Sequence, residues 1–152
     1  IGKFKRGTFT LEDKGAPESV LPFDVRPGRR PKIKLTFKDG VPVIDVKLNI
    51  EADIGSIPSR IPYAKVDRID ELNHLLARTV QEGVTRVIQK TQREWNSDIF
   101  GFGYYAAGYF FTIEQFEQYN WLGRYKDAKV NVAVEANIRR TGILAESAKI
   151  RH

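Results

Sequence analysis

The chain has 152 residues, 41% of them hydrophobic, and this length and apolar content suit one domain with one core. It contains no cysteine, which excludes disulfide bonds, thiolate nucleophiles and cysteine-ligated metal centres. The net charge is +6, and residues 1–38 alone carry ten Lys/Arg against four Asp/Glu, so the whole positive excess lies near the N-terminus.

The start of the chain has no signal-peptide pattern, because no charged region is followed by an apolar one. No segment reaches the roughly 20 apolar residues that span a bilayer. The sequence begins at Ile1 and lacks methionine entirely. We therefore expect a piece of a longer protein, from which a leader could have been removed.

Residues 10–31 contain four prolines and two glycines. Proline cannot donate a ladder hydrogen bond, and both residue types interrupt helices, so this composition argues against a regular helix or a central strand. We expect residues 1–31 to form a basic linker or edge segment, followed by a single α+β domain over residues 32–152.

Several cations in this region, which we call the basic flank, suit contact with the phosphates of lipid head groups or nucleic acid. The alternative is a solvated strand edge, on which lysines discourage pairing with other chains. The basic flank consists of Arg26, Arg29, Arg30, Lys32 and Lys34.

Apolar and polar residues alternate from residue 32 to Ile50, with an interruption at Asp39-Gly40. Asp-Gly between alternating runs is the strongest short hairpin signal, because a type I′ turn needs positive φ at both central positions. We expect two antiparallel strands with one buried face.

A long helix is predicted from Asp67 to Trp95, because apolar residues recur there at spacings of three and four. Its apolar stripe should lie on the hairpin. Gly83 costs about 1 kcal/mol relative to alanine inside a helix, so we expect close packing on a strand to compensate for it.

Two short aromatic helices should follow the long one. Asp98 and the preceding serine can cap a helix that runs to Tyr109. Thr112 and Gln115 have the spacing of a capping box, which predicts a second helix through Trp121.

Period-two alternation returns from Val130 to Ile138 and predicts the last strand. The expected fold class is therefore α+β. We expect an antiparallel or mixed sheet of about three or four strands, with the long helix and the two short helices packed on it, in the order β-β-α-α-α-β.

Few residues could carry out chemistry. The two histidines, His74 and His152, cannot assemble a zinc site, and no serine has the spacing of a nucleophile elbow. Glu94 and Asp98 are a carboxylate pair among aromatic residues, where burial could raise one pKa, but a helix cap beside a solvated side chain is the simpler interpretation. We predict no catalytic residue, no metal site and no bound cofactor.

The glycines and aromatic residues from Gly101 to Gly108 superficially resemble a phosphate-binding loop. The stretch lacks a preceding strand, a third glycine at the dinucleotide-binding spacing and the Lys-Ser/Thr pair of a P-loop. No Lys or Arg lies between Glu94 and Arg124, which disfavours nucleic acid as a partner. A core or a protein interface is favoured instead.

The run from Lys90 to Gly103, Lys-Thr-Gln-Arg-Glu-Trp-Asn-Ser-Asp-Ile-Phe-Gly-Phe-Gly, resembles the signature of the Ger(x)C family. Members of this family are the lipoprotein C subunits of nutrient germinant receptors in spore-forming bacteria. The last strand and the Arg-Arg-Thr-Gly after it are similar too, so the resemblance spans roughly residues 33–142. Its signature residues, expected in the core or at an interface, are Gln92, Trp95, Asp98, Phe100, Gly101, Gly103, Trp121 and Gly142.

The resemblance implies the C-terminal domain of a multi-domain lipoprotein, tethered by a lipidated N-terminal cysteine to the outer face of the spore inner membrane. It also implies two membrane-embedded partner subunits, A and B, and a non-catalytic role in nutrient-triggered germination through protein assembly. The lipidated cysteine is absent from this sequence, so the anchor is implied by the family alone. The alternative function is an anionic-surface binding module that uses the basic flank.

Overall fold

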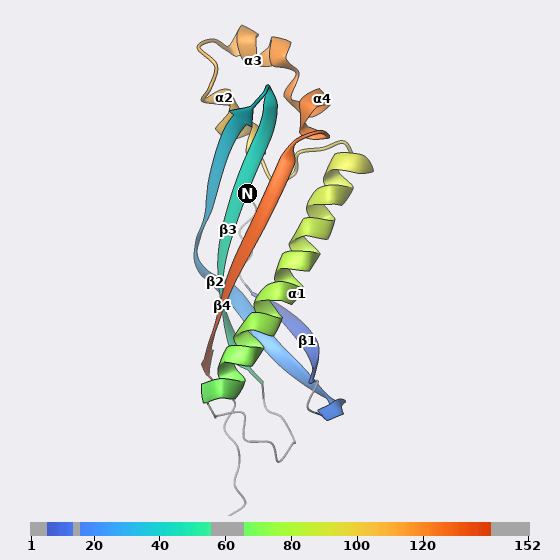
Figure 1. The fold of residues 1–152 in the computed structure, drawn as a ribbon, viewed down its shortest axis with the longest axis vertical. Helices are drawn as coiled ribbons and strands as arrows, with labels where there is room; N and C mark the ends of the chain where they lie inside the picture. Colours follow the sequence, from blue (N-terminus) through green and yellow to red (C-terminus); the bar gives the residue numbers. More distant parts are fainter. Residues whose placement is uncertain (1–5, 14–15, 56–65, 141–152) are drawn as a thin grey trace, which may run out of the picture.

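The computed structural model describes residues 6–13, 16–55 and 66–140. They form a mixed sheet with helices on one face and at one end, which confirms the α+β class (Figure 1). The order is β-β-β-α-α-α-α-β, with one more strand and one more short helix than expected. The elements are β1 (Gly7–Asp13), β2 (Ala16–Lys38), β3 (Val41–Ile54), α1 (Val66–Arg93), α2 (Phe102–Ala107), α3 (Ile113–Tyr119), α4 (Trp121–Tyr125) and β4 (Lys129–Arg140).

The strands follow one another across the sheet in sequence order, from β1 to β4. β1, β2 and β3 are antiparallel neighbours, whereas β4 pairs with β3 in parallel. The expected hairpin is present between β2 and β3, and its turn residues Asp39 and Gly40 have φ values of 52° and 78°. All four helices lie in the crossover from β3 to β4, which must return the chain to the starting end of the sheet.

The expectation that residues 10–31 exclude a central strand is wrong, because β2 lies between β1 and β3 from Phe23 to Val25. The prolines lie where a ladder ends or shifts register. The carbonyl of Pro22 accepts a hydrogen bond from the N–H of Gly55, just beyond the end of β3. The nitrogen and the carbonyl of one strand residue point to the same neighbour, so the nitrogen of Pro22, which carries no hydrogen, also points past the end of β3. Pairing with β1 ends at Val25, and the next prolines coincide with register shifts along the free edge of β2.

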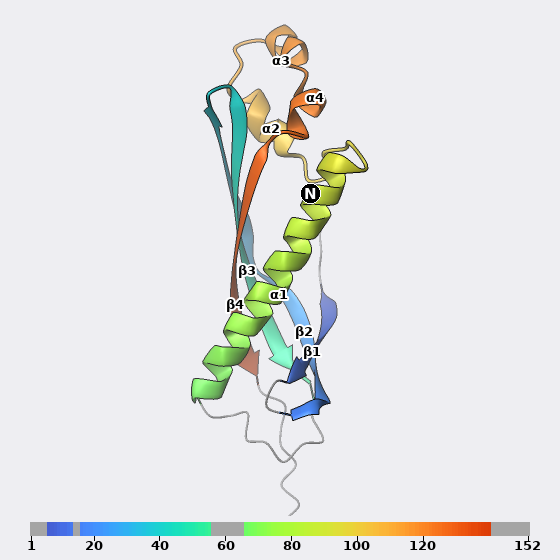
Figure 2. The same ribbon diagram turned by 45° about the vertical axis from the view of Figure 1, so that its right-hand side comes forward.

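Helix α1 confirms the predicted long helix and crosses one face of the sheet to run beside β4 (Figures 1 and 2). Its apolar stripe faces the sheet and contributes Leu72, Leu76 and Ile88 to the core. Near its start, the side-chain oxygen of Asn73 accepts a 2.8 Å hydrogen bond from the backbone N–H of Ile138 in β4. The helix therefore satisfies part of the backbone that β4 exposes at the edge of the sheet.

Gly83 does not pack on a strand, contrary to expectation. A Cβ built on this residue would meet no atom within 4 Å. Packing therefore does not require glycine at this position. The apolar stripe of α1 lies on a different side of the helix from the direction in which a Cβ at position 83 would point.

The buried side chains form two clusters along the length of the sheet. One lies between β1, β2 and the first half of α1, and the other lies where the short helices close over the β2–β3 hairpin. The first consists of Leu11, Leu21, Phe23, Val25, Ala52, Ile54, Leu72, Leu76, Val80 and Ile138. The second consists of Leu35, Ile44, Val46, Ile88, Phe102, Ala106, Trp121, Tyr125 and Ala128.

The short helices α2, α3 and α4 gather at the end of the molecule that holds the β2–β3 turn (Figures 1 and 2). Thr112 caps α3 as predicted, because its hydroxyl accepts from the backbone N–H of Gln115. The predicted second helix is divided, since Asn120 adopts a left-handed conformation with φ of 55° and α4 starts after it. We call residues 94–123 the cap.

Candidate functional site

The side chain of Asp98 holds two helices of the cap together. Its carboxylate accepts hydrogen bonds from the backbone N–H groups of Phe102 at 3.0 Å and Gly103 at 2.7 Å. It also accepts a 2.9 Å hydrogen bond from the indole Nε1 of Trp121. Asp98 therefore accepts hydrogen bonds from the first turn of α2 and joins it to the start of α4. The helix is shorter than expected, because it starts at Phe102 with Gly101 as its N-cap residue.

The glycines of the signature, Gly101 and Gly103, allow α2 and the Trp121 ring to lie close together, and they do not form a phosphate cradle. Gly101 has φ of 72°, a conformation that side-chain-bearing residues rarely adopt. A Cβ on Gly103 would lie 2.9 Å from two atoms of the Trp121 ring. The Trp121 indole therefore needs a residue without a side chain at position 103 to reach the Asp98 carboxylate.

Gln92 and Thr91 connect the end of α1 to the chain that enters β4. The Nε2 of Gln92 donates to the carbonyls of Tyr125 at 2.9 Å and Ala128 at 2.8 Å. The buried hydroxyl of Thr91 bonds the carbonyl of Ile88 and lies 2.8 Å from the hydroxyl of Tyr125. Burial raises the pKa of Tyr125, which keeps this phenol neutral.

The other signature residues have separate positions. Phe100 is half-buried and stacks on Phe102 with ring centroids 5.5 Å apart, whereas Trp95 is exposed. Gly142 lies outside the described residues. The structure thus brings Gln92, Asp98, Phe100, Gly101, Gly103 and Trp121 to the junction between α1 and the cap.

The cap offers no arrangement suited to acid–base chemistry. The Asp98 carboxylate already accepts three hydrogen bonds, and Glu94 is exposed. His74 lies exposed on α1. Within residues 6–13, 16–55 and 66–140, no group of three or more potential ligands from His, Asp and Glu is placed to hold a metal ion.

Large apolar side chains are exposed on the cap. The side chain of Phe111 is 97% exposed, that of Tyr104 is 88% exposed and that of Ile113 is 74% exposed. We call this surface the aromatic end. It consists of Tyr104, Tyr105, Tyr109, Phe111, Ile113 and Leu122.

The backbone that carries Phe111 is fixed on both sides. The neighbouring Phe110 packs against Phe116 and Tyr119, with ring centroids 5.6 and 5.1 Å apart. The N–H of Phe111 donates to the side chain of Gln115, whose own N–H donates to Thr112. The exposed ring is therefore held in place by an ordered turn.

A hollow of about 590 Å³ lies beside the aromatic end, between α2 and the α3–α4 corner. Gly103 and Trp121 contribute to its lining, and Tyr104 and Leu122 are its exposed large apolar residues. The hollow is mostly apolar, and among the described residues Asp98 and Glu117 are the only charged ones that line it. Its shape suits an apolar side chain from another molecule.

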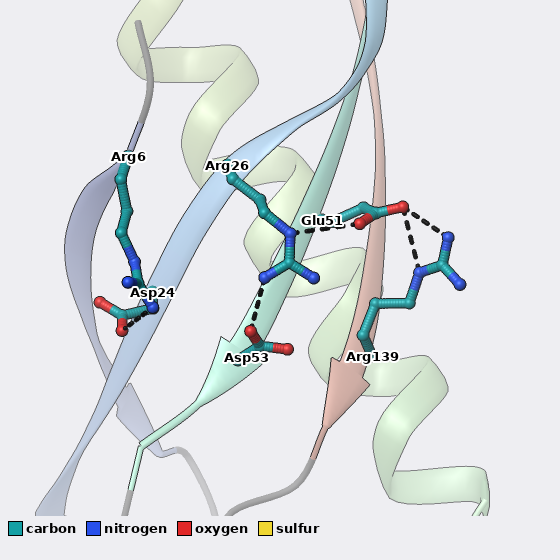
Figure 3. A network of polar contacts seen from close by, with 6 residues as sticks. All are labelled: Arg6, Asp24, Arg26, Glu51, Asp53 and Arg139. Atoms are coloured by element: carbon teal, nitrogen blue, oxygen red, sulfur yellow. Dashed lines mark hydrogen bonds and ion pairs between the residues drawn. The ribbon is translucent and has the colours of Figure 1, made fainter.

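The face of the sheet that α1 does not cover carries a polar network (Figure 3). Arg26 of β2 contacts Asp53 at 2.6 Å and Glu51 at 3.3 Å, and Arg139 of β4 also binds Glu51. The hydrogen bond from Arg139 lowers the pKa of Glu51, and the hydrogen bond to Asp53 raises the pKa of Arg26. One buried oxygen of Asp53 has no hydrogen-bond partner in the described structure. Arg26 thus links β2 to β3 through two ion pairs.

The remaining residues of the basic flank differ from Arg26. All four are exposed, and within the described residues none of them forms an ion pair, although Lys34 lies opposite Asp45 in the register of β2 and β3. Lys32 lies opposite Lys47 in the register of β2 and β3, which places two like charges side by side. The structure therefore separates Arg26 from Arg29, Arg30, Lys32 and Lys34.

The sequence interpretation favoured a core or an interface for residues 101–108, but it did not single out Phe111, Ile113 or Leu122 as exposed, and it missed the sheet network. A signal for the aromatic end was available, because residues 99–113 contain no charged residue. A signal for the sheet network was the alternation in β3, which places Glu51 and Asp53 on one face together with Asn49.

No helix of the described residues has both the length and the apolarity needed to cross a membrane. No curated protein matches the chain. The fold is similar to that of the crystal structure of the GerBC protein, with a TM-score of 0.70 and 14% sequence identity. The match covers 89% of this chain and 41% of that chain, so the chain spans less than half of the GerBC chain. The model of the family described as "Spore germination B3/ GerAC like, C-terminal" matches residues 1–142, so the chain belongs to this family of germinant-receptor C subunits.

Proposed function

We propose that this chain is a non-catalytic domain of a germinant-receptor lipoprotein and supports nutrient-triggered germination through protein assembly. Its partners are the membrane-embedded A and B subunits, and its place is the outer face of the spore inner membrane. A lipidated cysteine of the longer protein holds it there. Membership of the family supports each of these points.

The observation that carries the proposal is the exposure of Phe111, Tyr104 and Ile113 on an ordered surface. Exposed apolar patches rimmed by polar residues mark interaction sites, and aromatic residues are enriched at protein interfaces. Such residues also supply much of the binding energy in many complexes. The aromatic end is therefore the docking surface of the domain in this proposal.

The signature residues support an assembly role in a second way. Asp98, Gly103 and Trp121 hold the cap through hydrogen bonds and close packing. The Asp98 carboxylate is occupied by three donors, so it is not free to attack or protonate a substrate. The role of Asp98, Gly103 and Trp121 is to hold the aromatic end in one conformation.

The test uses spores that carry the full-length lipoprotein with Phe111→Ser and Ile113→Ser. We expect nutrient-triggered germination to slow by about tenfold or more, which corresponds to about 1.4 kcal/mol of lost binding. Recovery of the A subunit with the purified lipoprotein should fall in parallel. Germination by an agent that bypasses the receptors should remain normal.

Val87→Ser provides the matched control, because Val87 is an exposed apolar residue of α1 and is not part of the aromatic end. The abundance of each variant in the spore is measured by immunoblot, so that loss of the protein is distinguished from loss of docking. Normal nutrient germination in the Phe111/Ile113 variant would contradict the proposal.

The basic flank supports a second candidate function, binding to an anionic surface. The facing pair Lys32 and Lys47 is unfavourable without a counter-ion, which an anionic surface would supply. Replacement of Arg29, Arg30, Lys32 and Lys34 by glutamine should weaken sedimentation with phosphatidylglycerol vesicles. The wild-type binding should also fall steeply as salt is raised. Equal sedimentation of the two proteins would remove this candidate.

A further inference from the structure

The cap has an unusual charge for this chain. Residues 94–123 contain four Asp/Glu and no Lys/Arg, whereas the whole chain carries +6. The Asp98 carboxylate is held by three internal hydrogen-bond donors. Glu114 and Glu117 are exposed on α3, next to the aromatic end. Arg124, just beyond the cap on α4, lies over the Tyr119 ring, but the four carboxylates of residues 94–125 outnumber this one cation. The surface around the exposed aromatic residues is therefore acidic on balance.

The carboxylate of Glu114 keeps its charge. Hydrogen bonds from its own backbone N–H and from the Thr112 hydroxyl lower its pKa. Glu117 contributes directly to the lining of the hollow, and no basic residue lines it. An occupant of the hollow thus meets an apolar surface with negative charge at its border.

The walls of the hollow are complementary to a ridge of apolar side chains. Tyr104 of α2 and Leu122 of α4 are its exposed large apolar residues, and Gly101 and Gly103 also line it. Helices that bind in grooves insert apolar residues spaced three and four positions apart. The hydrogen bonds of Asp98 fix the start of α2 relative to the start of α4, so the hollow between them is already formed in the free protein.

We infer that the hollow between α2 and α4 is a socket for an amphipathic segment of a protein partner, whose apolar anchors are flanked by Lys or Arg. The inference deepens the proposed function, on which it rests, because it names the chemistry of the partner at the aromatic end. The apolar anchors contact Tyr104 and Leu122, and the cations of the segment face Glu117 and Glu114.

A lipid surface is a poorer occupant for two reasons. Anionic head groups repel the carboxylates of Glu114 and Glu117, which lie on the exposed side of α3. The surface also contains a hollow, whereas an amphipathic element that lies in a bilayer interface presents a continuous apolar face. Charge and shape both favour a basic protein segment.

The first test measures binding of two synthetic helical peptides to the full chain by titration calorimetry. Both peptides are about 14 residues long with leucines at helical spacings of three and four. One has lysines and the other has glutamates beside the leucines. We expect the lysine peptide to bind at least about tenfold more tightly than its glutamate twin, and salt to reduce the difference.

Variants locate the binding. Leu122→Ser and Tyr104→Ser should each weaken the lysine peptide by about tenfold, which is a typical loss for an anchor residue. Glu117→Gln should reduce the preference between the two peptides while leaving the glutamate peptide unweakened. Val87→Ser on α1 should change neither affinity. The unfolding midpoint of each variant shows whether it is folded.

Three results would overturn the inference: equal affinity for the two peptides, no binding of either up to about 1 mM, or undiminished binding to the folded Leu122→Ser variant. Binding to phosphatidylglycerol vesicles that requires Leu122 would also overturn it, by identifying lipid as the occupant. If Phe111/Ile113 spores fail to germinate while the peptides show no charge preference, the proposed function stands and the socket is rejected.

Discussion

Asp98 and Trp121, 23 positions apart in the sequence, are joined by a 2.9 Å hydrogen bond from the indole Nε1 to one carboxylate oxygen. The same oxygen accepts the backbone N–H of Gly103 at 2.7 Å. One atom therefore fixes the start of α2 against the start of α4. The position of the aromatic end depends on this contact.

Asp98→Ala should lower the free energy of unfolding by about 2–4 kcal/mol, because three partly buried donors lose their acceptor. Urea denaturation followed by tryptophan fluorescence measures the change. Asp45→Ala is the control, since Asp45 accepts one exposed hydrogen bond from Asn131 and its loss should cost less than about 1 kcal/mol. Equal losses in the two variants would contradict the role given to Asp98.

Gly103→Ala and Gly83→Ala should have opposite effects on stability. The added methyl group at position 103 would lie 2.9 Å from the Trp121 ring, so we expect a loss of about 1–3 kcal/mol. The methyl group at position 83 meets open space in a helix, so we expect a gain of about 1 kcal/mol. Thermal unfolding compares the two, and a stable Gly103→Ala protein would show that the indole can move away at little cost.

Glu51 should make stability depend on pH below its ordinary pKa of 4.5. The hydrogen bond from Arg139 lowers the folded-state pKa, so the unfolded chain binds more protons in this range and stability falls as pH decreases. The contribution is complete above 4.5 and is lost as pH falls through the lower folded value. Urea midpoints from pH 6 to pH 3 should fall less in Glu51→Gln than in the wild type. Glu82→Gln on α1 controls for loss of an exposed carboxylate, and parallel pH profiles of wild type and Glu51→Gln would refute this account.

Tyr125 should make the stability of the fold depend on pH at the alkaline end of the range. Burial raises its folded-state pKa above the ordinary 10.0, so the folded chain holds the phenol proton more strongly than the unfolded chain. Stability from this residue is present below pH 10.0 and is lost as pH rises through the folded value. Tyr125→Phe should reduce the alkaline loss without abolishing it, because burial also raises the pKa of Tyr119. Urea midpoints from pH 8 to pH 11 test this, with Tyr104→Phe as the exposed control.

Local patterns predicted much of the fold. The Asp39-Gly40 turn, the apolar stripe of α1 and the Thr112 cap each depend on residues close in sequence, and each is present. The parallel pairing of β4 depends on how the crossover packs, which alternation in a single strand does not encode. β1 and the first half of β2 were hidden because the prolines of residues 10–31 lie at strand ends, free edges and bulges.

The site was predictable in part for a similar reason. Asp98 could be recognised from its position as an acceptor at the start of a helix, and it accepts from Phe102, although Gly101 is the N-cap residue. Burial could not be recognised, because Phe102 and Tyr104 are both aromatic residues of α2, yet the first is in the core and the second is 88% exposed. Only the orientation of α2 on the sheet distinguishes them.

The parallel pairing of β3 with β4 also has a consequence for folding kinetics. Ile44 and Val130 are register partners separated by 86 positions, whereas β2 and β3 meet across a two-residue turn. Long-range pairing slows folding, so the hairpin should form first and β4 should arrive after the helices are placed. Until then β3 is an open edge that other chains can join. During synthesis the cap emerges before β4, so the edge of β3 stays unpaired until the last described strand has been made.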